Sequence, residues 1–186
     1  IQQIHFTDKT LNISAISLSA QEVSVLEGQN GDTTFEFTVT RSGQTNNKQT
    51  VRYGVSDGAT NSANNRDFTK NNIPSGVLTF EAGETTKTIS INVKGDLSYE
   101  SDERFVLNLK APSSGVTLLN TSAAATILND DILLGDGQVS YAGSSGDDVV
   151  YGNALNNNIS GDQGSDYLDG GLGNDSLSGG DGLDTF

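Results

Sequence analysis

A nine-residue repeat at the C-terminal end of the chain constrains its fold more than any other feature. From Gly143 to Phe186 the sequence divides into GSSGDDVVY, GNALNNNIS, GDQGSDYLD, GGLGNDSLS and GGDGLDTF. Every unit opens with glycine. The sixth place holds Asp148, Asn157, Asp166, Asp175 and Asp184, and the eighth holds Val150, Ile159, Leu168, Leu177 and Phe186. A flexible Gly/Asp spacer would share this composition but would not keep the nine-residue phase of its polar and apolar residues. We therefore expect a regular repeating fold.

Each unit combines a turn with a short strand. Glycine tolerates positive φ without steric cost, so the first six residues suit a turn. The last three form a strand whose middle residue points inward, and such strands stack at roughly 4.8 Å. The resulting apolar column is too thin to offset a conformational entropy cost of about 1–2 kcal/mol per residue. Carboxylates beside glycine turns supply the oxygen ligands of Ca²⁺, which predicts that calcium provides the missing stabilisation.

The units resemble the nonapeptide repeats of RTX (repeats-in-toxin) proteins. The resemblance implies a parallel β-roll with calcium between units n and n+2, bound by backbone carbonyls and by the sixth-place side chains. It implies one site at Ser144, Gly146, Asp148, Gly161, Gln163 and Asp166, and a second at Asp162, Gly164, Asp166, Gly179, Asp181 and Asp184. A third, on the opposite side, would use Asn153, Leu155, Asn157, Gly170, Leu172 and Asp175. Because Asn157 replaces an Asp, we expect the third site to bind less firmly.

The preceding part of the chain alternates apolar and polar residues with the period of a β-strand. Phe35, Phe37 and Val39, for example, are separated by polar residues. We expect strands over residues 16–26, 34–41, 50–56, 76–80, 85–94, 103–110 and 116–128. This pattern predicts an antiparallel β-sandwich of immunoglobulin-like architecture, so that both parts of the chain are all-β.

Acidic residues of the sandwich gather in its expected loops. Loops that join alternate strand ends meet at one pole, where carboxylates within ~4 Å repel by about 1–4 kcal/mol per pair. A shared cation relieves this repulsion, and hard oxygen ligands select calcium.

Five motifs in order resemble a Calx-β domain over roughly residues 16–131: VLEG at 25–28, RDF at 66–68, GVLTFEAGE at 76–84, ESDERF at 100–105 and TILNDD at 126–131. The resemblance implies calcium at one pole. Its candidate ligands are Glu27, Asp67, Asp96, Glu100, Glu103, Asp130 and Asp131, with a carbonyl from Ser98. The family's calcium sensors have consecutive Asp residues where this chain has Gly95-Asp96, which implies fewer ions or weaker binding. The alternative is that these carboxylates only make caps and turn hydrogen bonds.

The chain is expected to contain two modules. Residues 1–15 form a linker or edge strand, 16–131 the sandwich, 132–142 a junction and 143–186 the roll. Residues 134–142 form a degraded repeat with Tyr141 in the eighth place and Val139 in the sixth, which suits a capping unit. Ile1 and Phe186 are expected to be cut ends of a longer, secreted bacterial chain.

Composition excludes several functions. The segment from Gly135 onward holds nine Asp and no basic residue, and so carries −9 of the net charge of −14. Nucleic acid and anionic membrane surfaces are therefore not expected as partners. There is no Cys, and no apolar run approaches the ~20 residues of a membrane span. The only histidine, His5, lies near the N-terminus, so no catalytic set is expected and the chain is interpreted as non-enzymatic.

These features predict a calcium-binding structural module of a large secreted or cell-surface protein of the adhesin or matrix type. Its repeats would order when millimolar calcium outside the cell neutralises their aspartates. The expected partners are calcium, neighbouring domains of the same chain and cell-surface or matrix ligands, and the fragment is expected to be monomeric. An alternative is a non-catalytic secretion and folding tail of a secreted enzyme or toxin. Carbohydrate binding is a weaker alternative, because the chain has no Trp to stack on sugar rings.

Overall fold

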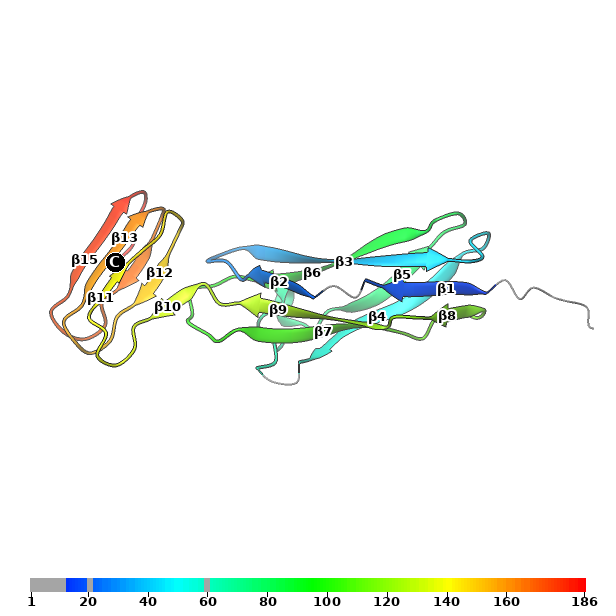
Figure 1. The fold of residues 1–186 in the computed structure, drawn as a ribbon, viewed down its shortest axis with the longest axis horizontal. Helices are drawn as coiled ribbons and strands as arrows, with labels where there is room; N and C mark the ends of the chain where they lie inside the picture. Colours follow the sequence, from blue (N-terminus) through cyan, green and yellow to red (C-terminus); the bar gives the residue numbers. More distant parts are fainter. Residues whose placement is uncertain (1–12, 20–21, 59–60) are drawn as a thin grey trace, which may run out of the picture.

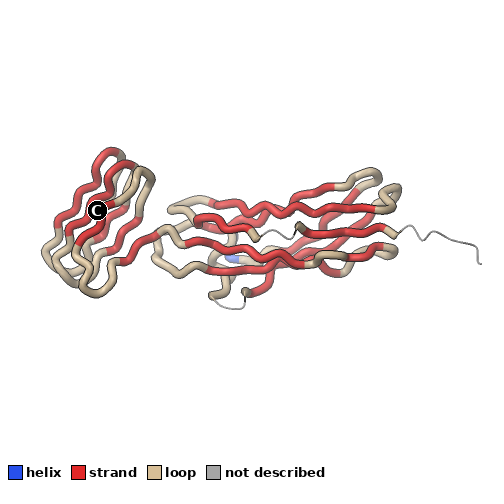
Figure 2. Tube along the Cα trace, in the orientation of Figure 1, coloured by secondary structure: helices blue, strands red, loops and turns tan. Residues whose placement is uncertain are grey.

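The computed structural model describes residues 13–19, 22–58 and 61–186. It contains a β-sandwich and a small β-roll at one end of it (Figure 1). Strands and loops account for nearly all of the described chain (Figure 2), and the one helical turn is the 3₁₀ helix η1 (Thr69–Asn71). The predicted all-β fold is confirmed. Most of the linker expected over residues 1–15, together with His5, lies outside the described residues.

The sandwich consists of two sheets. The first has the order β6-β3-β1-β8, and the second has the order β2-β9-β7-β4-β5. The strands are β1 (Ser14–Leu18), β2 (Val23–Leu26), β3 (Asp32–Ser42), β4 (Gln49–Asp57), β5 (Ser75–Phe80), β6 (Thr86–Lys94), β7 (Glu103–Lys110), β8 (Val116–Leu118) and β9 (Ser122–Leu128). Their pairing is antiparallel except at β1–β8 and β2–β9, which are parallel.

Two of the expected strands are divided between the sheets. The strand predicted over residues 16–26 is β1 in one sheet and β2 in the other, and the strand predicted over 116–128 is likewise β8 and β9. A single extended segment cannot pair with two sheets on opposite sides of a core, so the chain crosses between them. The described sandwich therefore has nine strands rather than the predicted seven.

Alternating side chains fill the space between the two sheets. Phe35, Phe37 and Val39 of β3 are fully buried in one core cluster with Phe105 of β7. The rings of Phe35, Phe37 and Phe68 pack edge-to-face on Phe105, with centroids 5.3, 6.2 and 5.5 Å from it. This geometry is favourable for aromatic pairs beyond their buried area. Phe68 therefore ties the loop between β4 and β5 to the core.

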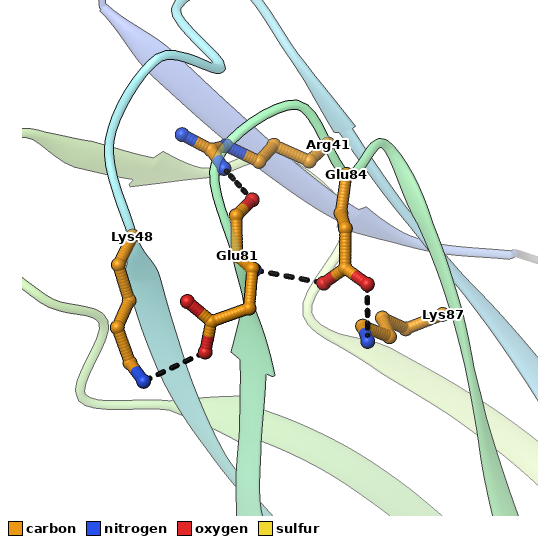
Figure 3. A network of polar contacts seen from close by, with 5 residues as sticks. All are labelled: Arg41, Lys48, Glu81, Glu84 and Lys87. Carbon is orange, nitrogen blue, oxygen red and sulfur yellow. Dashed lines mark hydrogen bonds and ion pairs between the residues drawn. The ribbon is translucent and has the colours of Figure 1, made fainter.

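The sandwich end far from the roll is held by a buried cation (Figure 3). Arg41, only 3% exposed, donates hydrogen bonds to the carbonyls of Glu81, Gln44 and Asn47 at 3.3, 2.9 and 2.7 Å. On the surface beside it, Lys48 pairs with Glu81 at 2.7 Å. Arg41 thus joins the β3–β4 turn to the β5–β6 turn.

The roll consists of two parallel three-stranded sheets. One contains β10 (Asp131–Leu133), β12 (Val149–Tyr151) and β14 (Tyr167–Asp169), and the other β11 (Ser140–Ala142), β13 (Asn158–Gln163) and β15 (Ser176–Asp181). Ile132, Val150 and Leu168 align in the first sheet, and Tyr141, Ile159 and Leu177 in the second. These residues form the thin core between the sheets.

The two ends of the roll differ from the expectation. β10 begins at Asp131, so the first sheet starts three residues before the degraded repeat predicted at 134–142. At the other end, Phe186 is 67% exposed rather than inward. The preceding residue, Thr185, bridges to Tyr167: its N–H donates to the Asp166 carbonyl at 2.7 Å and its carbonyl accepts the Leu168 N–H at 2.9 Å.

Candidate calcium centres

The sandwich carries its predicted carboxylates at the end that faces the roll (Figure 1). Strand alternation explains their position. Glu27 lies two residues beyond Val25, and Glu103 two residues before Phe105, so both continue the inward face of a strand past the last core side chain. Asp67 precedes the buried Phe68 and is itself 7% exposed. The core therefore positions acidic side chains at the edge of an apolar interior.

Three carboxylates of this pole form one compact group. Asp67, Glu100 and Glu103 each offer an oxygen within 4.8 Å of the others. Asp67 comes from the β4–β5 loop, whereas Glu100 and Glu103 come from the end of the β6–β7 loop and the start of β7, more than thirty residues later. A cavity of about 360 Å³ opens beside them, with Asp67, Asp96, Ser98 and Glu100 in its lining. The sequence-predicted ligands from these loops are thus brought together.

The remaining predicted ligands surround this group. Asp96 accepts a hydrogen bond from the backbone N–H of Ser98 at 2.9 Å and pairs with Lys94 at 3.4 Å. Asp130 accepts hydrogen bonds from the Gly28 N–H at 3.2 Å and from the Gln29 amide at 3.0 Å. These two carboxylates therefore already have partial compensation for their charge.

Asp131 is different. It is 4% exposed, and its Oδ1 has no hydrogen-bond partner among the described residues. Burial, followed by the nearby charges of Asp130, Asp96 and Glu100, raises its pKa to about 6. A buried anionic oxygen without a donor is costly unless a cation neutralises it.

The same cause acts on the buried Glu27 and, at the same pole, on the half-buried Glu100 and Glu103. Burial, followed by the charges of neighbouring carboxylates, raises the pKa of Glu27 to about 8. Burial and a hydrogen bond with Asp67 raise the pKa of Glu103 to about 8, and burial with the charge of Asp67 raises that of Glu100. Asp96 is the exception: burial acts upward, but hydrogen bonds from Ser98 and Lys94 outweigh it and lower the pKa. Their surroundings therefore disfavour the charged forms of Glu27, Glu100 and Glu103.

In the roll, the sixth-place side chains form two columns with a spacing of eighteen residues. The N–H of Asp148 donates to Oδ1 of Asp166 at 2.9 Å, and the N–H of Asp166 donates to Oδ1 of Asp184 at 3.1 Å. On the other side, the N–H of Asn157 donates to Oδ1 of Asp175 at 2.8 Å. The second carboxylate oxygen of each Asp turns back over the first glycine of its own unit.

The centre of the column of Asp148, Asp166 and Asp184 holds an oxygen without a partner among the described residues. Asp166 is 2% exposed, and its Oδ2 has no hydrogen-bond partner in the described chain. Burial raises its pKa, and so do the charges of Asp148, Asp184 and Asp147. Asn157, at the equivalent place on the other side, is satisfied internally: its Oδ1 accepts the Asn153 N–H at 3.0 Å, and its amide nitrogen donates to the Gln138 carbonyl at 3.3 Å. The two sides therefore differ in their need for a cation.

The predicted carbonyl ligands lie close to these columns. The carbonyls of Gly161, Gly170 and Gly179 lie 2.0, 2.2 and 2.7 Å from where a Cβ would stand on Gly143, Gly152 and Gly161. The carbonyls of Gly146, Asn153, Leu155, Asp162 and Gly164 lie equally close to glycines two units further on. Those of Ser144, Asn153 and Asp181 accept backbone hydrogen bonds from Gln163, Leu172 and Gly164. The glycines thus let carbonyl-rich turns stack in contact.

Comparison with known proteins identifies the two modules. A model of the Calx-beta domain matches residues 11–131, which is more than half of the chain. The chain belongs to the Calx-beta family. A model of the RTX calcium-binding nonapeptide repeat matches residues 141–154 and 151–186. Both predicted resemblances are confirmed, in the predicted order, and they establish the chain as a calcium-binding module.

Solved structures support the assignment of the Calx-beta part. The crystal structure of the apo-form Calx CBD1 domain is 29% identical, has a TM-score of 0.56, and covers 64% of this chain and 99% of its own. CBD12 from CALX1.2 is 26% identical with a TM-score of 0.55, and the match covers 70% of this chain and 51% of that one. The Calx CBD2 domain, at 17% identity and a TM-score of 0.50, shares the fold.

Two sets of residues at the Calx-beta pole and in the roll were not predicted from the sequence. Asn129 accepts the N–H of Glu100 at 3.1 Å and donates to the carbonyl of Asp131, so it links two acidic loops. In the roll, the fifth-place side chains of Asp147 and Asn156 accept the N–H groups of Ser165 and Asn174 at 2.7 and 2.9 Å. The polar fifth place recurs in four units, so a signal was present in the sequence.

The donor set fits Ca²⁺. Carboxylate and carbonyl oxygens predominate at both centres, and calcium takes six to eight such ligands in flexible geometry. Asp131 and Asp166 each present a buried oxygen that lacks a donor in the described part of the chain. Within the described ranges, no helix has the length and apolar composition needed to cross a bilayer.

Proposed function

We propose that this chain is a calcium-dependent structural module of a secreted or cell-surface protein of the adhesin or matrix type. The sandwich would occupy residues 16–131, the junction and capping repeat 132–142, and the roll 143–186. Calcium would bind at the sandwich pole and between the turns of the roll, through the ligands set out above. The module would be disordered in its repeats at low calcium and folded at millimolar calcium outside the cell.

One observation carries this proposal: the buried, unpaired Oδ2 of Asp166 between Asp148 and Asp184. Folding of the roll stacks three aspartates on consecutive turns, where their negative charges repel one another. A divalent cation on either side of Asp166 removes the repulsion and supplies the missing partner. The free energy of binding then appears as free energy of folding.

The residues have distinct roles in this mechanism. Asp148, Asp166 and Asp184 supply the charge, and the glycine turns bring backbone carbonyls close enough to share in coordination. The buried inward residues Val150 and Leu168 of one sheet and Ile159 of the other set the register of the turns. Calcium supplies charge neutralisation when bound. The opposite side, where Asn157 is already hydrogen-bonded, contributes less.

Replacement of Asp166 tests the proposal against a matched position. In wild-type chain, calcium titration followed by far-UV circular dichroism is expected to convert coil to β-structure. Asp166→Asn, which removes a charge that two ions share, is expected to raise the calcium midpoint at least about tenfold, or roughly 1.4 kcal/mol. Asp175→Asn, which faces Asn157, is expected to shift it less.

Two outcomes would contradict the proposal. If several millimolar calcium leaves the wild-type spectrum unchanged, the roll does not fold by calcium binding. If the two variants shift the midpoint equally, the stronger sites do not lie along Asp148, Asp166 and Asp184. A magnesium titration gives the control for charge screening, because Mg²⁺ demands a smaller octahedral site.

A further inference from the structure

The roll is covalently and structurally continuous with the calcium pole of the sandwich. Strand β9 ends at Leu128, and β10, the first strand of the roll, begins at Asp131. Asp131 pairs in register with Val149 of β12. The same residue contributes a buried, unpaired oxygen to the acidic pole. One residue is therefore shared between the acidic cluster and the first strand onto which the repeats stack.

A second contact joins the two modules. The hydroxyl of Tyr151 in β12 donates a hydrogen bond to the carbonyl of Leu97 in the β6–β7 loop. Leu97 lies between the candidate ligands Asp96 and Glu100. Since Val150 points into the roll, its neighbours Val149 and Tyr151 lie on the outer face of the same sheet. Although it lies on that outer face, Val149 is only 1% exposed. Figure 1 shows this sheet on the sandwich side of the roll.

The loop between β6 and β7 thus touches both modules. Its Glu100 belongs to the group of Asp67, Glu100 and Glu103, and its Leu97 carbonyl accepts the hydrogen bond from the roll. In the absence of a cation, carboxylate oxygens within 4.8 Å of one another repel, which acts against the arrangement of this group. Whatever neutralises the group also fixes the loop on which Tyr151 rests.

We propose that the sandwich pole is a calcium-controlled cap for the roll, so that calcium at the pole raises the calcium affinity of the repeats. Fixing Asp131 and the β6–β7 loop presents β10 and the Leu97 carbonyl as a preformed first coil. The repeats then add to an ordered strand instead of nucleating alone, as terminal units do in other stacked repeats. Linkage requires the reverse effect as well: a folded roll tightens calcium binding at the pole. This inference rests on the proposed function.

The test measures the two modules separately in the full chain. Hydrogen–deuterium exchange with mass spectrometry, over a calcium titration, reports peptides from the roll and from the sandwich in one sample. Asp67→Asn changes a carboxylate of the pole that makes its hydrogen bond within the sandwich and none to the roll among the described residues. We expect it to raise the calcium midpoint for protection of residues 143–186 at least about fivefold, the lower bound of typical coupling. An unchanged midpoint in the roll would overturn the inference.

A second pair of variants tests the contact itself without altering a candidate ligand. Tyr151→Phe removes the hydroxyl that reaches Leu97, and we expect the roll midpoint to rise. Tyr167→Phe is the matched control, because the Tyr167 ring lies tilted against that of Tyr151, with centroids 5.8 Å apart, on the same face, and its hydroxyl has no partner among the described residues. Equal midpoints for the two variants would contradict the role of the contact.

Combining the variants shows whether they act by one route. If pole occupancy reaches the roll partly through Tyr151, Asp67→Asn and Tyr151→Phe together shift the midpoint less than the product of their separate effects. If the combined shift of the midpoint equals the product of the two separate shifts, the two variants do not act by a shared route. Failure of the proposed function looks different: the roll of the wild-type chain would gain no protection at any calcium concentration.

Discussion

At the scale of single residues, the roll depends on where side chains are absent as much as on where carboxylates are present. A Cβ on Gly161 would stand 1.9 Å from Oδ2 of Asp166 and 2.7 Å from the carbonyl of Gly179. The glycine therefore vacates the space in which the carboxylate and carbonyl oxygens of two coils converge. Gly135, in the degraded repeat, has nothing within 4 Å of its Cβ position.

These two glycines give a prediction with an internal control. Gly161→Ala is expected to abolish or strongly weaken calcium-induced folding of the roll, because the methyl group displaces the Asp166 carboxylate. Gly135→Ala is expected to leave the calcium midpoint unchanged within about twofold, since the methyl group meets open space. Calcium titration followed by circular dichroism compares them. A Gly161→Ala chain that folds at the wild-type calcium concentration would show that this packing is not required.

The buried acids of the pole predict how the calcium-free sandwich responds to pH. Glu27 and Glu103 have pKa values raised from an ordinary 4.5 to about 8. Between these values the unfolded chain releases protons that the folded chain retains, so stability is highest below pH 4.5 and falls as pH rises to 8. For Glu27, which is 7% exposed, the loss is on the order of a few kcal/mol.

Thermal unfolding in the presence of a chelator measures this effect. The melting temperature is expected to fall from pH 5 to pH 8 by on the order of 10 °C. Saturating calcium should remove the trend, because the metal binds the deprotonated carboxylates. Glu27→Gln should flatten the chelator profile. A melting temperature that rises with pH in chelator would contradict the raised pKa values.

At the scale of secondary structure, the sequence predicted most strands but not how the chain divides them between sheets. The strand over 103–110 was predicted with its observed ends because alternation and turn residues agree there. Residues 16–26 and 116–128 read as continuous strands, since a crossing between two sheets leaves the alternating pattern unbroken. Which sheet a segment joins depends on tertiary pairing that local pattern does not encode.

Arg41 is an element-scale feature that composition and periodicity did not reveal. Its guanidinium joins two turns through backbone carbonyls, of which Figure 3 shows the one of Glu81, and a carbonyl partner carries no sequence signal. Arg41→Lys is expected to cost about 2–4 kcal/mol in denaturant unfolding, because a single ammonium cannot replace the planar fork. Lys48→Gln, at an exposed ion pair, is expected to cost less than about 1 kcal/mol.

Both variants are expected to keep the wild-type calcium midpoint of the roll, because the Arg41 network lies at the far end of the sandwich. Denaturant unfolding at constant calcium gives the stability, and exchange protection of residues 143–186 gives the midpoint. Equal stability losses for Arg41→Lys and Lys48→Gln would show that the buried guanidinium contributes no more to the free energy of unfolding than an exposed ion pair.

At the scale of the whole molecule, the sequence located both candidate centres but not the connection between them. The pole could be predicted because sandwich loops converge at one end, and the columns because the repeat fixes their phase. The Tyr151–Leu97 contact could not, since Tyr151 sits on the outer face of a roll strand, where the nine-residue pattern places no constraint. The strand at 131–133 was also missed, because it lacks the glycine that opens each regular unit.

Alternation of the coil between two sheets restricts how such a chain can change in length. Consecutive units belong to opposite sheets, and only units eighteen residues apart share a column. Insertion of one nonapeptide would move every later unit to the other sheet. Asn157 or its copy would then lie in line with Asp148 or Asp184, the aspartates that flank Asp166 in the present chain. Insertion of two would add one complete coil, about 4.8 Å long, and keep both columns intact. The natural unit of gain or loss in this roll is therefore eighteen residues, although the unit visible in the sequence is nine.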